Sequence, residues 1–136
     1  MTKSIKIYTD GGSRGNPGPA AGGIVIFDNN DKLLKINAKY FGRITNNQAE
    51  YEALISALRT AQLMNVSKVK CYLDSELIVK QLNGVYKIKS DNIRGHKETV
   101  DKLSRNFDSI EYFHVTREKN TFADKLVNIV LDSKEV

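Results

Sequence analysis

Four acidic residues stand out because of where they fall in the predicted elements. Asp10 and Asp74 each end a run of apolar and β-branched residues that predicts a strand. If these strands are neighbours, both carboxylates reach the edge of the sheet where α/β proteins place their ligand sites. Glu50 lies on the apolar stripe of a predicted helix, and Asp124 lies in the first turn of another. If the four acids converge, they form a site for hard divalent cations such as Mg²⁺ or Mn²⁺.

Each acid taken alone also has an ordinary explanation. Asp10 fits a turn before two glycines, Asp74 fits the cap of the next helix, and Asp124 fits an exposed acid that stabilises a helix start. Glu50 fits these explanations less well, because an unpaired carboxylate that faces a core is costly. The chain has one cysteine and two histidines, so the Cys/His cluster typical of zinc sites is absent from the sequence.

Length and charge restrict the class of protein. The 136 residues fit one domain, 1–136, and no stretch has the roughly 20 apolar residues that a membrane span requires. The formal net charge is +5 and the sequence pI is about 9.3, which suits a polyanionic partner. The first residues lack the apolar region of a secretory signal, so a cytoplasmic protein is expected. The lone Cys71 is expected to be a buried thiol.

Hydrophobic periodicity predicts the elements that must position the acids. Residues 45–65 have helical spacing, and Thr45 with Gln48 makes a capping-box pattern at the start. Further helices are predicted at 76–82, 92–107 and 121–131, the last with Ala123, Leu126, Val127 and Val130 inward. Strands are predicted at 4–10, 20–27, 33–41, 69–74 and 110–115. Three meander strands followed by alternating helices and strands predict one mixed sheet covered by helices.

Four segments of the chain resemble, in order, the four motifs of type 1 ribonuclease H. They are residues 8–19, 45–50, 74–76 and 120–124. Each motif alone is moderate evidence, but the ordered set spans essentially the whole chain. The resemblance implies an α/β, ribonuclease H-like fold: a five-stranded mixed sheet with its first three strands antiparallel, flanked by helices on both faces.

The resemblance also implies an activity. It implies an endoribonuclease that hydrolyses the RNA strand of RNA/DNA hybrids and leaves 3′-hydroxyl and 5′-phosphate ends. A monomer is expected by default. Asp10, Glu50, Asp74 and Asp124 would bind two Mg²⁺ ions, with Mn²⁺ as a substitute, in agreement with two-metal chemistry at a phosphodiester. Six further residues match hybrid-contacting positions of the family: Arg14, Gly15, Asn16, Asn46, Asn47 and Glu76.

The loop before the last predicted helix departs from many relatives of this family. Residues 116–120 contain no histidine at the place where those relatives carry a catalytic one. Arg117, Glu118 and Asn120 are therefore candidates to assist the reaction. His114 falls inside a predicted strand and is interpreted as a structural residue. This short loop resembles that of archaeal and some bacterial members of the family.

Other departures concern contacts with the substrate. Glu76 stands where relatives commonly carry glutamine, and an ionised acid donates no hydrogen bond to a base. The extra basic helix of some relatives, the protrusion, is missing from the sequence. Six basic residues are expected either to bind phosphates or to form a solvated helix face: Lys87, Lys89, Arg94, Lys97, Lys102 and Arg105. His96 is expected to be exposed and without chemistry.

Two alternative functions stay open at this point. One is a nucleic-acid-binding module of the same fold with weak or lost activity, which the four intact acids disfavour. The other is a metal nuclease of broader specificity that also cuts double-stranded RNA. The glycine and asparagine residues of 15–16 and 46–47 favour the hybrid, because amides can address minor-groove base edges and 2′-hydroxyls.

Overall fold

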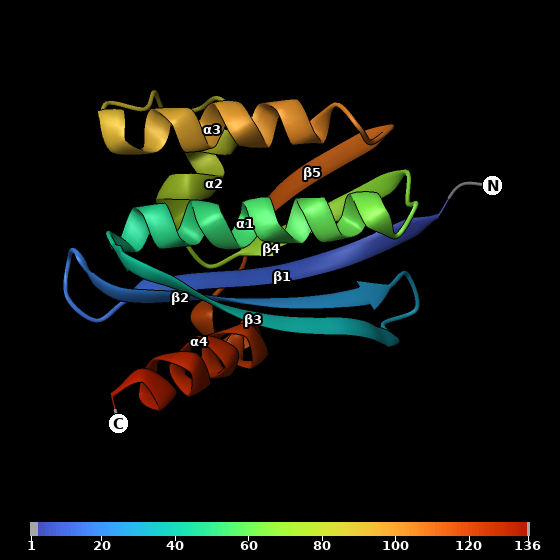
Figure 1. Ribbon diagram of the computed structural model, residues 1–136. Helices are drawn as coiled ribbons and strands as arrows, with labels where there is room; N and C mark the ends of the chain where they lie inside the picture. The colour runs from blue at the N-terminus through green and yellow to red at the C-terminus, as the bar shows by residue number, and fades with distance from the viewer. Residues whose placement is uncertain (1–2, 136) are drawn as a thin grey trace.

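The structure, a computed structural model, describes residues 3–135 as one five-stranded sheet with helices on both faces (Figure 1). The strands are β1 (Ser4–Ser13), β2 (Gly18–Asp28), β3 (Leu33–Ile44), β4 (Lys68–Leu73) and β5 (Ser109–His114). The helices are α1 (Asn46–Leu63), α2 (Glu76–Leu82), α3 (Asp91–Ser104) and α4 (Thr121–Lys134), with a 3₁₀ turn η1 (Arg117–Lys119) before α4.

The sheet has the strand order β3-β2-β1-β4-β5. β2 pairs antiparallel with both β1 and β3, while β4 pairs parallel with β1 and with β5. The predicted mixed sheet with three antiparallel strands at its start is thus confirmed. Because β1 and β4 are neighbours, with Thr9 opposite Leu73, the residues that follow them reach the same edge.

The predicted end of the first strand at Asp10 is wrong. β1 continues to Ser13, and Gly11 and Gly12 pair with Gly22 and Ala21 of β2. Two consecutive glycines suggested a turn, but their lack of side chains serves close packing instead. A Cβ atom on Gly11 would lie 2.2 Å from the carbonyl oxygen of Ala49, so α1 rests directly on the β1 backbone.

The main core lies between α1 and one face of the sheet, with α3 packed against α1 (Figure 1). Leu54, Leu58 and Ile7 are fully buried there. α4 covers part of the opposite face, where Val127 and Leu131 bury against Ala21. Helices therefore flank both faces, as the family resemblance implies.

Local signals position the two helices that carry acids. The capping box at α1 is confirmed: the Gln48 amide donates to Thr45 Oγ1, and the Thr45 amide donates to the Gln48 side chain. In α4 the fully buried stripe is Ala123, Val127 and Leu131, while Leu126 and Val130 are only half-buried.

Within residues 3–135, no helix combines the length and apolar character that crossing a membrane requires.

Gly23 and Gly95 make a matched test of how α4 docks on the sheet. A Cβ atom on Gly23 would lie 2.3 Å from the Ala123 carbonyl oxygen, so we expect Gly23→Ala to lower the free energy of unfolding by about 1–3 kcal/mol. Gly95 lies within α3 and a Cβ there would meet no atom within 4 Å, so Gly95→Ala should raise it by about 0.5–1 kcal/mol. Urea denaturation measures both changes, and equal effects would contradict the docking.

Candidate active site

Three acids from three elements converge at the edge of the sheet. Asp10 of β1, Glu50 of α1 and Asp74 after β4 each offer one carboxylate oxygen, and these atoms all lie within 4.8 Å of one another. Asp124, in the first turn of α4, lines the same cavity of about 350 Å³ but is not part of this group of three. The four predicted acids therefore share one cavity, which we call the acid cavity.

Glu50 is the most deeply placed acid of the cavity. Its side chain is 4% exposed, and its Oε1 accepts a hydrogen bond of 2.9 Å from the Gly11 amide. Among residues 3–135, no group donates to its Oε2. Burial and the neighbouring Asp10 raise the pKa of Glu50 well above its usual value. A buried carboxylate oxygen without a donor needs a proton or a cation.

Asp10 has the second perturbed carboxyl group. It is 8% exposed, and burial, reinforced by the charges of Asp74 and Asp124, raises its pKa to about 7. At neutral pH the cluster therefore retains protons that a divalent cation would replace. The donor set is entirely oxygen, which fits Mg²⁺ or Mn²⁺ better than zinc. The residues present thus fit a metal site.

Asn120 holds Asp74 in position by a hydrogen bond. It is 1% exposed, and its Nδ2 donates to the Thr9 carbonyl at 2.8 Å and to Asp74 Oδ2 at 3.2 Å. Of the other two assisting candidates, Arg117 lines the acid cavity and Glu118 does not. His114 ends β5, as expected for a strand residue, with Nδ1 4.0 Å from a Glu76 oxygen. Whether these residues assist the reaction stays a prediction.

Arg14 lines the acid cavity but is held by the end of α4. Its guanidinium lies 2.6 Å from Asp132 and 2.6 Å from Glu135, and it donates to Asn128 Oδ1 at 3.2 Å. Contact with a substrate phosphate would have to replace some of these bonds. Asn128 was not predicted, although its spacing of four residues from Asp124 places both on one helix face.

The other predicted contact residues do not all lie together. Asn46 and Asn16 join the first loop to the start of α1: the Asn46 amide donates to Asn16 Oδ1 at 3.0 Å, and Asn46 Oδ1 accepts from the Ser13 amide. Gly15, in the same loop, has φ of 105°, which favours glycine. Asn47 and Glu76 lie elsewhere. Asn47 lines a separate pocket beside Lys87 and Lys89, and Glu76 pairs with Lys80 at 3.0 Å.

One expectation for this surface needs correction. His96 is not freely exposed: its side chain is 21% exposed and its Nε2 lies 2.9 Å from a Glu52 oxygen, because α3 packs against α1. Lys97 is tied to Asp101 at 2.8 Å, and Arg94 pairs with Asp91 on the same helix. These pairs weaken the charge that α3 presents to phosphates.

Comparison with known proteins adds independent evidence. Residues 8–130 match the family model described as reverse transcriptase-like. Ribonuclease HI of Halobacterium salinarum is 39% identical over 128 residues, which are 94% of this chain and 64% of that protein. A bifunctional protein of Mycobacterium tuberculosis is 37% identical over 95% of this chain and 36% of its own length. The chain therefore spans less than two thirds of either relative.

A solved structure matches over nearly the full length of both chains. The crystal structure of LC11-RNase H1 in complex with an RNA/DNA hybrid superposes with a TM-score of 0.93 and 42% identity. It covers 97% of this chain and 99% of that one. The two folds therefore agree over 97% of this chain.

The perturbed acids predict how the stability of the metal-free protein depends on pH. The folded-state pKa of Asp10 is raised from 3.8 to about 7. Between these two pH values the folded protein therefore binds more protons than the unfolded chain. Stability should therefore fall as pH rises through this range, by on the order of 2–4 kcal/mol. Calorimetry in EDTA at about pH 5.5 and about pH 8 measures the fall.

Two variants separate the acid cavity from other titrating groups. Asp10→Asn should remove most of this loss, whereas Asp108→Asn, in an exposed turn, should leave it unchanged. Adding Mg²⁺ at the higher pH should restore stability to the unmodified protein. The same pH dependence in the unmodified protein and both variants would show that the neighbours of Asp10 do not raise its pKa.

Asn120 offers a test of how Asp74 is held in position. Asn120→Ala removes the amide that orients Asp74, so we expect the affinity for Mn²⁺ to fall roughly 10–100-fold. Titration calorimetry measures this affinity without any substrate. The control is Asn106→Ala, an exposed residue after α3. Unchanged Mn²⁺ binding in a folded Asn120→Ala protein would refute the positioning role.

Proposed function

Because this chain belongs to the ribonuclease H family, we propose that it is an endoribonuclease that hydrolyses the RNA strand of RNA/DNA hybrids. The single observation that carries the proposal is the convergence of Asp10, Glu50 and Asp74 within 4.8 Å, with Asp124 in the same cavity. Fold similarity alone would support a non-catalytic module equally well. A binding module has no need for acids that repel one another.

The four carboxylates would hold two Mg²⁺ ions, with Mn²⁺ as a substitute. When bound, such a pair activates a water on one side of a phosphodiester and stabilises the leaving oxygen on the other. Glu50 is the member with an unsatisfied buried oxygen, so it has the strongest need for a cation. Attack on the phosphorus with release of the 3′ oxygen leaves 3′-hydroxyl and 5′-phosphate ends.

The residues of the chain itself supply orientation. The Gly11 amide fixes one oxygen of Glu50, and the Asn120 amide fixes one oxygen of Asp74. Both donors belong to a rigid backbone or a buried side chain, so the acids need little rearrangement during the reaction. Protons that Asp10 holds near neutral pH are released when cations bind.

Recognition of the hybrid would begin beside the acid cavity. The bonds among Ser13, Asn16 and Asn46 hold the first loop against α1, at the side where a minor groove would lie. Arg14 would exchange its bonds to Asp132 and Glu135 for a phosphate. The proposal also includes that the chain is one domain and acts as a monomer.

Cleavage of labelled duplexes tests the proposal. End-labelled RNA/DNA hybrid, double-stranded RNA and double-stranded DNA are incubated with the protein in Mg²⁺, Mn²⁺ or EDTA. We expect metal-dependent cutting of the RNA in the hybrid. Because one metal ligand contributes several kcal/mol to the transition state, Asp10→Asn should lower kcat/KM at least about 1,000-fold.

The control for this experiment is Asp108→Asn, which changes an exposed acid outside the acid cavity. It should retain the activity of the unmodified protein. Full activity of Asp10→Asn would refute the site. Cutting of double-stranded RNA at a similar rate would broaden the substrate class, and analysis of the product ends checks the position of bond breakage.

A further inference from the structure

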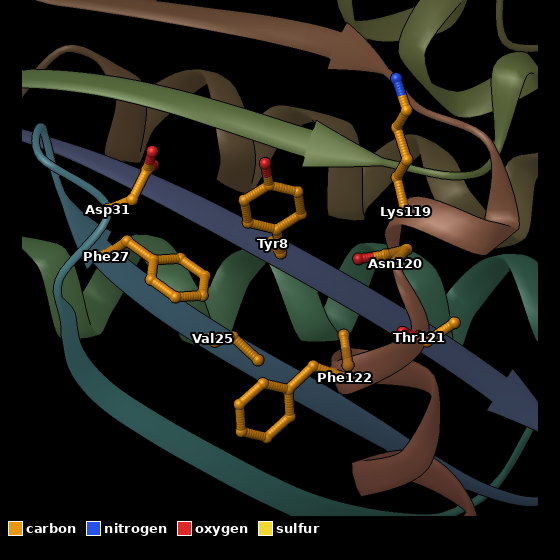
Figure 2. Close-up of a pocket in the computed structure, with 9 residues that line it drawn as sticks. Tyr8, Val25, Phe27, Asp31, Lys119, Asn120, Thr121 and Phe122 are labelled. Carbon is orange, nitrogen blue, oxygen red and sulfur yellow. The ribbon is translucent and has the colours of Figure 1, made fainter.

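A second pocket lies on the sheet face that α1 does not cover. Its volume is about 340 Å³, at the lower end of small-molecule sites, and it is lined by Asn120, whose Nδ2 donates to Asp74. Figure 2 shows the rings of Tyr8, Phe27 and Phe122 around it, with Asp31 at one end and Lys119 and Asn120 at the other. We call this the aromatic pocket.

The aromatic pocket ends a row of stacked rings. Tyr8 stacks on Tyr72 with centroids 4.7 Å apart and planes at 14°, and Tyr72 stacks on Phe113 at 5.3 Å and 27°. These residues pair across β1, β4 and β5, so the row crosses the sheet. Tyr8 is its terminal ring at the pocket, where Phe27 meets it edge-on at 5.7 Å. A flat ligand in the pocket would extend this array of rings.

Positive groups surround one end of the aromatic pocket. Within residues 3–135, Lys119 makes no ion pair, and no side chain caps the first turn of α4, whose amides at residues 121–123 lack helical acceptors. A helix start with free amides attracts anions. At the opposite end of the pocket Asp31 is paired with Lys6 at 2.9 Å, so the positive groups lie at the Lys119 end.

Asn120 supplies a buried acceptor at the same end. Its Nδ2 is occupied by Thr9 and Asp74, whereas its Oδ1 has no donor among the described residues. Figure 2 shows the Asn120 oxygen pointing toward Tyr8, into the pocket side of the chain. An aromatic wall, a cationic rim and an unpaired acceptor together match a nucleotide, whose base stacks and whose phosphate is anionic.

We propose that the aromatic pocket binds one unpaired nucleotide of a single-stranded RNA segment next to the duplex. The base would lie against Tyr8 and Phe122, and its phosphate against Lys119 and the α4 amides. The pocket adjoins the acid cavity through Asn120, so a strand leaving the cavity over the start of α4 reaches it directly. This inference rests on the proposed function for the duplex, but the pocket itself is tested without cleavage.

Binding of a fluorescein-labelled RNA tetranucleotide in EDTA tests the pocket. Anisotropy gives its Kd, and amide NMR shifts give its place. We expect shifts at residues 119–123, and Phe122→Ala should raise Kd about tenfold, as loss of one stacking ring does. Lys119→Ala should raise Kd as well. Phe122 is 42% exposed, so its loss should leave the fold intact, which the amide spectrum checks.

Matched controls are Ile129→Ala, an exposed apolar residue on the same helix, and Lys39→Ala, an exposed lysine on β3. Neither should change Kd. An unchanged Kd in Phe122→Ala and Lys119→Ala, or shifts confined to residues 10–16 and 46–50, would overturn the proposal. Those shifts would place the RNA in the acid cavity alone.

A cleavage assay then connects the pocket to the duplex. The ratio of kcat/KM for a hybrid with a single-stranded RNA extension to that for a blunt hybrid should exceed one, and Phe122→Ala should bring it to about one. Ile129→Ala should retain the ratio. If the protein cuts neither hybrid, the proposed function fails while tetranucleotide binding still decides on the pocket. A ratio of one in the unmodified protein would overturn the link.

Discussion

Mutual repulsion among two buried carboxylates and a half-buried one is the constraint on which the architecture depends. Asp10, Glu50 and Asp74 bring oxygen atoms within 4.8 Å of one another, a placement that is unfavourable unless protons or cations compensate. Close packing enforces it, because the backbone of β1 touches α1 at Gly11 and the amide there binds Glu50. The core under α1 must therefore provide the stability that the acid cavity removes.

Local periodicity accounts for the part of the fold that the sequence predicts. The capping box of Thr45 and Gln48 and the helical spacing behind it identify α1, and alternation identifies the strands. The pairing of β1 with β4 could be stated only as a condition, because strand pairing is a non-local property. Glu50 was noticed since an acid on an apolar stripe conflicts with ordinary placement. Whether the acids act as metal ligands stays a prediction.

Contacts between distant side chains escaped prediction. Arg14 meets the end of α4 more than a hundred residues later, and no local pattern encodes that pair. His96 looked exposed in a polar run, but the packing of α3 on α1 sets it beside Glu52. The two glycines after Asp10 read as a turn, although they continue β1, because a turn and a close helix contact both favour the same residue.

Asn120 explains how a short loop without histidine is compatible with an ordered acid cavity. Its amide bonds to Thr9 and Asp74 fix the residue that precedes α4, and the contact of Gly23 with Ala123 fixes the first turn of the helix. Asp124 is placed by these two contacts, not by the exposed residues 116–119. The placement of Asp124 therefore does not depend on the length or sequence of this loop. Asn120 contacts Asp74 of the acid cavity and also lines the aromatic pocket, so both sites share the start of α4.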